Sequence, residues 1–123
     1  MQPKFSFAVI PELDLVTIEM SGFFQPADVR KFEEARDDAH RQLICGPNRH
    51  RTLVDMREML IQSQDSVAEF QRVLSNPSTR SRKLAIVVSK TLARMQIQRA
   101  AEQRDVKYFA DGTEEARTWL LAD

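Results

Sequence analysis

The sequence is poor in cysteine and glycine, and it lacks any long apolar run. Cys45 is the single cysteine among 123 residues, so no disulfide can form within the chain, and such a composition is typical of a reducing environment. No apolar run approaches the roughly 18 residues of a membrane-spanning helix, and no basic-then-apolar leader opens the sequence. We therefore expect a cytoplasmic protein without a transmembrane segment.

Residues that commonly form catalytic or metal centres are also scarce. The three glycines stand far apart, which excludes a glycine-rich phosphate loop. Cys45, His40 and His50 supply one thiol and two imidazoles, without the spacing of a metal-ligand cluster. No third group in the pattern would orient Cys45 and His50 as a nucleophile and its base. The sequence therefore predicts no metal, no cofactor and no catalytic residues.

The chain has no net charge, because 18 lysines and arginines balance 18 aspartates and glutamates. A neutral chain has no overall field that attracts polyanions, so we expect no nucleic-acid partner. The charge is unevenly distributed, however: residues 41–104 hold 12 basic and 5 acidic side chains, a local excess of +7. Two interpretations stay open for this basic segment, namely a solvated surface whose sign varies by chance and a face that binds an anion.

Five segments have the patterns of strands. Apolar and polar residues alternate over residues 5–9 and again over residues 16–20, and the short gap between them favours an antiparallel hairpin. Residues 51–56 predict a short third strand. The run Lys83–Ser89 is apolar between two polar ends, which is typical of a strand covered on both faces. Residues 106–109 predict a partly polar strand at an edge.

Four helices are expected between and after these strands. The first covers residues 26–44 and has Pro26 at its first position. The second begins at a capping box formed by Ser66 and Glu69, the third runs from about Thr91 to Gln103, and the last follows Gly112. The side chains expected to face the core are Val29, Phe32, Ala35, Ala39 and Leu43 in the first helix, Val67, Phe70, Val73 and Leu74 in the second, Leu92, Met95, Ile97 and Ala100 in the third, and Ala116, Trp119 and Leu120 in the last.

These elements give the order ββαβαβαβα over a single domain, residues 1–123. We expect an α/β fold in which one mixed five-stranded sheet packs with four helices. The connection from the second to the third strand should be a parallel, right-handed crossover. An unpaired strand edge also leaves a homodimer open as the oligomeric state.

Open α/β sheets bind ligands outside the carboxyl ends of their strands. The candidate ligand-binding residues at these ends are Asp55, Met56, Arg57, Lys90, Arg94 and Met95. A second interpretation of Asp55 stays open, in which its carboxylate caps a local turn or accepts backbone amides. Lys90 and Arg94 would either clamp an anion or lie in solvent. An enzyme that uses Asp55 with Arg57 or Lys90 is disfavoured, because no two groups with opposed acid–base roles are evident.

Ser63 and Ser66 are candidate phosphoacceptors, because both stand where a helix is expected to begin. A phosphate there would meet free backbone amides and the positive end of the helix dipole. A plain N-cap role explains Ser66 equally well, so both interpretations stay open.

Taken in order, these segments resemble the STAS domain group, and in particular its stand-alone bacterial SpoIIAA-like branch. The resemblance is carried by Leu15–Ile18 running into Gly22–Phe24, by Leu53–Asp55, by Leu84–Val88, and by Phe109–Asp111 followed by Ala116–Leu120. It implies a compact sheet with helices and no enzymatic centre. In the classical branch, a kinase partner phosphorylates a serine that opens a helix, in an Asp-Ser-Ser-Gly type of turn. Asp65-Ser66 matches two residues of that turn here, and the following serine and glycine are missing.

The resemblance implies a non-enzymatic regulatory module that binds another protein through the helix after the third strand and its adjacent loops. The same branch is similar to lipid-binding Sec14-type domains. That likeness implies an alternative function, a carrier for a small apolar or anionic ligand with its pocket at the carboxyl ends of the strands.

Overall fold

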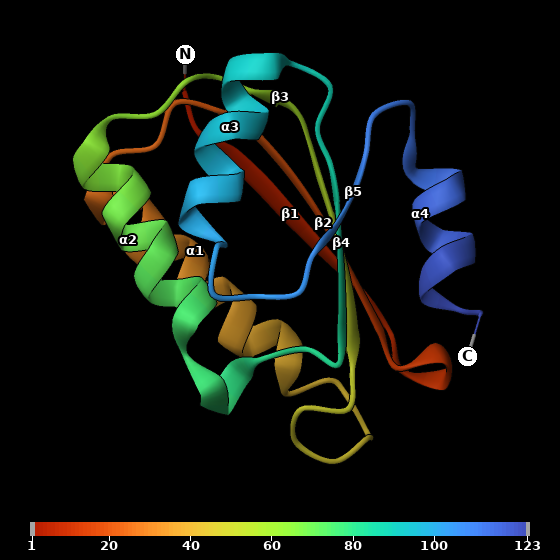
Figure 1. Cartoon of the computed structure of the whole chain (residues 1–123). Coiled ribbons are helices and arrows are strands. Elements are labelled where there is room, and N and C mark those ends of the chain that lie inside the picture. The colour runs from red at the N-terminus through yellow and green to blue at the C-terminus, as the bar shows by residue number, and fades with distance from the viewer. Residues whose placement is uncertain (1, 123) are drawn as a thin grey trace.

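The computed structural model describes residues 2–122, which form a five-stranded sheet and four α-helices (Figure 1). The elements in chain order are β1 (Lys4–Ile10), β2 (Leu15–Gly22), α1 (Pro26–His40), β3 (Arg51–Met59), α2 (Gln64–Ser75), β4 (Lys83–Val87), α3 (Thr91–Ala100), β5 (Lys107–Phe109) and α4 (Thr113–Leu120). Two short 3₁₀ turns, Pro11–Leu13 and Pro77–Thr79, link β1 to β2 and α2 to β4. The expected order and the mixed sheet are confirmed.

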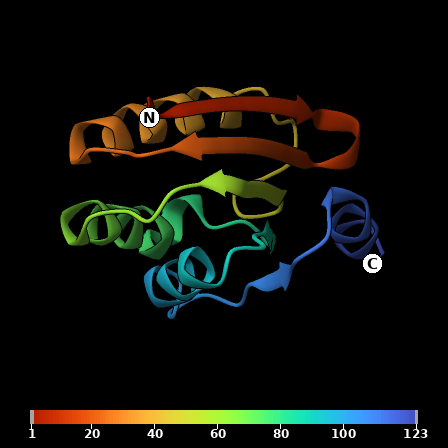
Figure 2. The ribbon, with the colours of Figure 1, turned by 90° about the horizontal axis from the view of Figure 1, so that it is seen from above.

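The strands lie in the sheet in their chain order, from β1 at one edge to β5 at the other. β1 and β2 form the expected antiparallel hairpin, and the remaining neighbours are parallel. Crossovers of one hand that always advance in the same direction place their helices on the same face of a sheet. Figures 1 and 2 accordingly show α1, α2 and α3 together on one face and α4 alone on the other. The homodimer expected from an unpaired edge stays a prediction.

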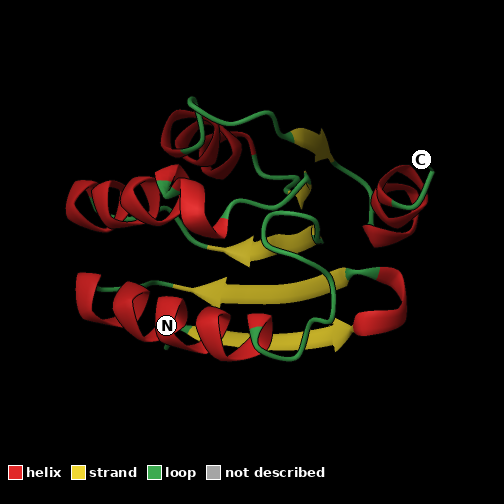
Figure 3. Ribbon diagram, turned by 90° about the horizontal axis from the view of Figure 1, so that it is seen from below, coloured by secondary structure: helices red, strands yellow, loops and turns green. Residues whose placement is uncertain are grey.

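The α4 face of the sheet is only partly covered. Helix α4 packs on β3, β4 and β5, and Figure 3 shows the β1–β2 hairpin extending beyond it. On β1, Lys4, Ser6 and Ala8 are exposed. This uneven cover leaves a polar part of the sheet open to solvent.

Two apolar clusters fill the two sides of the sheet. The larger one lies under α1, α2 and α3, and the smaller one lies under α4. β4 contributes to both, because Leu84 and Ile86 point into the larger cluster while Ala85 and Val87 point into the smaller one. All four side chains are at most 4% exposed. This confirms the predicted strand with two covered faces.

Phenylalanines join the hairpin to the helices on the larger side. Phe5, Phe7, Phe24, Phe32 and Phe70 pack ring against ring, with centroid distances from 5.3 to 6.4 Å. Such ring pairs add about 0.5–1.5 kcal/mol each beyond the area that they bury. They therefore fix the edge hairpin against α1 and α2.

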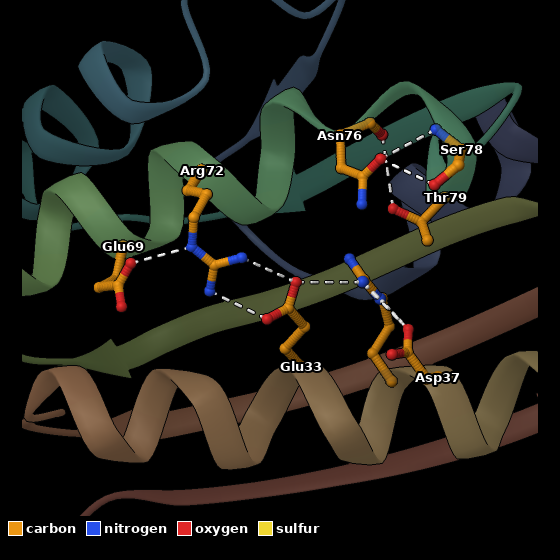
Figure 4. A network of polar contacts seen from close by, with 8 residues as sticks. Glu33, Asp37, Glu69, Arg72, Asn76, Ser78 and Thr79 are labelled. Atoms are coloured by element: carbon orange, nitrogen blue, oxygen red, sulfur yellow. Dashed lines mark hydrogen bonds and ion pairs between the residues drawn. The ribbon is translucent and has the colours of Figure 1, made fainter.

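A charged network joins α1 to α2 on the surface (Figure 4). The Arg72 guanidinium donates to both carboxylate oxygens of Glu33 at 2.9 and 3.2 Å, and to Glu69 at 3.0 Å. Arg30 donates to the other oxygen of Glu69 at 2.7 Å. Exposed ion pairs stabilise by at most about 1 kcal/mol each, so the network aligns helices that the apolar core already holds together.

The predicted start of the second helix was wrong by about one turn. Ser63, not Ser66, is the N-cap of α2, and its side-chain oxygen accepts the Ser66 backbone N–H at 3.2 Å. Ser66 is fully buried within the helix, and its hydroxyl donates to the Phe24 carbonyl at 2.6 Å. The Ser66 hydroxyl is therefore bound to Phe24, 42 residues away, and does not cap the helix.

The predicted core face of the third helix was also partly wrong. Leu92 and Met95 are 59% and 56% exposed, while Ala93, Ile97 and Ala100 face the core. Several predicted ends shifted as well: α1 ends at His40, β3 at Met59, β4 at Val87 and α3 at Ala100. Ala116 and Leu120 of α4 are fully buried, as expected.

We expect Gly22→Ala to destabilise the protein strongly. Gly22 has a φ of +89°, and a Cβ at this position would lie 2.2 Å from the backbone oxygen of Gln2. A strained backbone of this kind costs about 1–3 kcal/mol, so the free energy of unfolding in urea should fall by at least that amount. Gly112→Ala is the matched control, because a Cβ there meets nothing within 4 Å. Equal losses for the two variants would contradict this account.

Candidate functional site

The six predicted ligand-binding residues do not form one site. Asp55 and Arg57 point to the α4 face of the sheet, whereas Met56 is buried on the opposite face. Lys90 is the exposed N-cap of α3, and Met95 is exposed on that helix. Arg94 lies over the ring of Tyr108, 5.5 Å from its centroid. The period of two along β3 separates the first three residues, because neighbouring side chains of a strand point to opposite faces.

Asp55 and Arg57 form a tight pair on β3. The Arg57 Nε and Nη2 groups donate to the two Asp55 carboxylate oxygens at 3.0 and 2.7 Å. The Arg57 backbone N–H also donates to Asp55 at 3.1 Å. The interpretation of Asp55 as an acceptor of local backbone amides is therefore confirmed.

A bulge in β3 explains why Asp55 has this role. Glu19 pairs with Asp55 and Ser21 pairs with Glu58, so two residues of β3 oppose Met20 alone. A bulge leaves a backbone group without its ladder partner, and the Asp55 carboxylate accepts the Arg57 N–H there. Hydrogen bonds from Arg57 hold the pKa of Asp55 below its usual value. The carboxylate is thus an ionised structural group.

A shallow polar groove surrounds this pair on the open part of the α4 face. Lys4, Ser6 and Glu19 of the hairpin line it beside Asp55 and Arg57. Both signs of charge are present, and the oppositely charged Asp55 and Arg57 are paired with each other. Glu58 lines the groove too, so its three carboxylates exceed its two basic groups by one, and the groove is not suited to an anion.

Gln62 organises the opposite side of the strand ends. Its side-chain oxygen accepts the Phe24 N–H at 2.8 Å, and its side-chain nitrogen donates to the carbonyls of Gly22 and Leu60 at 3.0 and 2.6 Å. The Gln62 backbone is held in turn by the Gln96 side chain, with bonds of 2.7 and 2.8 Å. One residue thus connects the segments after β2 and β3 to α3.

A small apolar cavity lies beside this clamp. Met56, Met59, Phe70, Val88, Ala93 and Ile97 line it together with neighbouring side chains. Its volume is about 30 Å³, which is room for about two waters. Pockets that hold small-molecule ligands measure about 300–1,000 Å³, so the cavity is too small in this conformation for a lipid or a comparable ligand.

Large apolar side chains are exposed around the clamp. Ile61 is 52% exposed, and Leu92 and Met95 are exposed to a similar degree. Ile61 adjoins Gln62, Leu92 lies one helical turn before Gln96, and Met95 is its neighbour. We call these three residues the α3 surface. In Figure 1, α3 and the connection from β3 to α2 lie at the same end of the molecule.

The two candidate phosphoacceptors differ in access. Ser63 is half-buried at the start of α2, and Ser66 is fully buried. The Ser63 hydroxyl donates to the Ser66 oxygen at 3.1 Å, and Ser66 donates onward to Phe24. The serines therefore extend the contact between the start of α2 and the start of α1.

Several important residues have no signal in the sequence. Gln62 and Gln96 are 34 positions apart, and no motif marks either of them. Leu92 and Met95 were expected in the core because their spacing places them on one face of a helix, and that spacing does not show whether the face is buried or exposed. Within residues 2–122, no group of three His, Cys, Asp or Glu side chains could hold a metal ion, and no helix there has the length and apolar character to cross a bilayer.

The model of the SpoIIAA-like family matches residues 15–121, which is nearly the whole chain. No curated protein matches the sequence.

We expect Asp55→Ala to lower the free energy of unfolding by about 1–2 kcal/mol, because a backbone amide and a guanidinium both lose their acceptor. Asp55→Asn keeps an acceptor oxygen and should cost less. Because the pKa of Asp55 is lowered in the folded state, its contribution is present above the unfolded pKa and is lost as the pH falls through the folded value. The difference between the native chain and Asp55→Asn should therefore shrink in acid.

Urea titrations at a series of pH values would measure this difference. Asp111→Asn is the matched control, because Asp111 is an exposed carboxylate before α4. A loss of stability for Asp55→Asn that is independent of pH would contradict the proposed role of the ionised carboxylate.

Proposed function

Since this chain belongs to the SpoIIAA-like family, whose STAS-type modules are commonly regulatory, we propose that it is a non-enzymatic regulatory module that binds another protein. The observation that carries the proposal is the α3 surface, formed by Ile61, Leu92 and Met95. Three large apolar side chains that are each more than half exposed are costly to leave in water. Exposed apolar groups gathered in one place commonly mark interaction sites.

The charges around the α3 surface indicate the chemistry of its partner. Lys90, Arg94 and Arg99 lie on or next to α3, and the helix contains no acidic residue. An interface gains specificity and association rate when its charges oppose those of the partner. The partner that fits is therefore a protein with an apolar contact ringed by acidic side chains.

The Gln62–Gln96 clamp supports the same proposal. It holds the loop that carries Ile61 against α3 through two hydrogen bonds between the Gln96 side chain and the Gln62 backbone. A surface whose parts are already fixed loses less conformational entropy when it binds. The clamp thus makes the α3 surface a pre-organised docking face.

We expect Leu92→Asp to weaken the binding of this partner by at least about tenfold, since a buried leucine stabilises by about 1.5–3 kcal/mol. A photo-crosslinking amino acid in place of Met95 would report the contact in cells. Discrete protein adducts should form at this position and should decrease when Leu92→Asp is added. Adduct formation should also decrease at high salt, because exposed charges are screened.

The same crosslinker in place of Thr118 is the matched control, because Thr118 is exposed on α4 at the other side of the sheet. Equal adducts from both positions would show general stickiness and would overturn the proposed surface. Adducts with lipid alone at position 95 would overturn it too, because a membrane would then be the partner.

We also propose that any phosphorylation of this module takes place on Ser63. Ser63 is the N-cap of α2 and is half-buried, whereas Ser66 must leave its bond to Phe24 before a kinase can reach it. A phosphate at the start of a helix is favoured by free amides and by the helix dipole. Ser63 lies next to Gln62, so its modification would act on the loop that carries Ile61.

We expect Ser63→Asp to change the free energy of unfolding by less than about 1 kcal/mol, because Asp is also a good N-cap. Ser66→Asp should cost more than about 3 kcal/mol, because it places an unpaired charge in the core. Denaturation of both variants checks the difference. If Ser66→Asp were as stable as Ser63→Asp, the proposed choice between the two serines would be wrong.

The two other functions considered from the sequence have less support. A carrier would require the apolar cavity to grow about tenfold to reach the usual size of ligand pockets. An enzyme based on Asp55 would require a carboxylate that is free to exchange protons or attack a substrate. Asp55 instead accepts three hydrogen bonds from Arg57.

A further inference from the structure

A second cavity lies on the three-helix face, near the starts of the parallel strands. It opens between α1, the end of α2 and the segments that lead into β3 and β4, and it has a volume of about 80 Å³. Five basic side chains line it: Arg36, His40, His50, Arg80 and Arg104. No carboxylate is among the described residues that line it.

His50 is a buried polar side chain whose hydrogen-bonding capacity is not fully used. It is only 4% exposed, and it lines the cavity. Its Nε2 atom has no hydrogen-bond partner among the described residues. Buried polar atoms nearly always have a partner in native proteins, and an unpaired one calls for an explanation. The His40 ring lies beside it, with 4.4 Å between the ring centroids.

The arginines make the surroundings of His50 electropositive. Arg36 is buried and pairs with Asp37 at 3.1 Å. Within residues 2–122, the guanidinium groups of Arg80 and Arg104 form no hydrogen bond or ion pair. Burial and the nearby charge of Arg80 lower the pKa of Arg104, while Asp105 acts to raise it. Two unpaired guanidinium groups thus lie close enough to repel each other.

A simpler account is that these cations only balance the ends of two helices. His40 ends α1, and the cavity also borders the end of α2. Each helix end carries a negative charge of about half a unit, so the two ends together balance about one cation. Arg80 and Arg104 supply two cations, and Asp105 is a nearby carboxylate that acts on Arg104. No carboxylate is among the described residues that line the cavity itself, and His50 Nε2 stays unpaired in this account.

We propose that this cavity binds a small tetrahedral oxyanion, either free phosphate or sulfate or the terminal group of a phosphomonoester. A volume of about 80 Å³ holds roughly five waters, and hence the five heavy atoms of such an ion. Arg104 and Arg80 would donate charge-assisted hydrogen bonds to the oxyanion. His50 would donate from Nε2, and Thr79 and Ser81 also line the cavity.

Titration of isotope-labelled protein with inorganic phosphate, sulfate or glycerol phosphate tests this site. The ring signals of His50 and His40 should shift in a saturable way, with a dissociation constant on the order of millimolar or tighter. Arg104→Gln should weaken binding about tenfold, because it removes a hydrogen bond to a charged group. Arg117→Gln, an exposed arginine on α4, should leave the affinity unchanged.

Sulfate also tests the role of His50 through pH, because its charge is constant over the range used. Burial, His40, Arg104 and Arg36 lower the pKa of His50 to about 4, and Asp14 is the one group that acts to raise it. A bound anion favours protonated His50, so its pKa should rise when sulfate binds. The affinity for sulfate should then increase as the pH falls from neutral, and His50→Gln should reduce this increase.

The outcomes separate the sources of the oxyanion and can overturn the proposal. Binding of phosphate or sulfate supports a free ion, and markedly tighter binding of glycerol phosphate supports a phosphomonoester. Absence of saturable shifts with all three compounds would overturn the site, as would equal losses for Arg104→Gln and Arg117→Gln. Arg80→Gln provides a second test if Arg104→Gln does not fold. None of these results depends on a partner at the α3 surface.

Discussion

The hydrogen bonds of the buried Gln62 side-chain amide hold together the loops at the carboxyl ends of the strands. Three parallel crossovers bring separate loops together at the carboxyl ends of the strands, and each loop exposes backbone groups that need partners. The amide meets these groups in only one orientation, because Phe24 offers an N–H while Gly22 and Leu60 offer carbonyls. An apolar residue in its place would remove the partner of the Phe24 N–H and of the Leu60 carbonyl, at about 1–3 kcal/mol each, while the Gly22 carbonyl would still accept the Leu60 N–H at 3.2 Å. The same residue is bound by Gln96, so the position of α3 depends on it as well.

The topology of the sheet divides the surface into regions with different properties. Because the strands follow one another in chain order, three helices share one face and α4 alone covers the other. At the carboxyl ends, the loop after β3 and the start of α3 expose apolar side chains beside basic ones. Near the starts of the same strands, five basic side chains enclose a cavity. Helix α2 runs between its N-cap Ser63, which lies beside the first region, and its C-cap Asn76, which lines the second.

The two regions place the basic middle of the sequence in two different roles. Lys90, Arg94 and Arg99 lie on or beside α3, while Arg80 and Arg104 surround the cavity. Meanwhile Arg72 and Arg30 serve the contact between α1 and α2. Five of the twelve basic residues of the segment 41–104 thus lie either beside the α3 surface or around the cavity.

The sequence alone determined the strands, the helices and the class of fold. The alternation in β2 and the apolar run of β4 depend on the period of side chains along a strand, which is a local property. Only the tertiary structure decided which side chains are available for function. Ser66 lost its capping role to Ser63 because Phe24, 42 residues away, accepts its hydroxyl. Two faces of α3 carry enough apolar side chains to pack on the core. In the structure Ala93, Ile97 and Ala100 face the core, and Gln96 bonds to Gln62. Contacts between residues far apart in the sequence decide which side chains are buried, and the local pattern of apolar residues does not reveal such contacts.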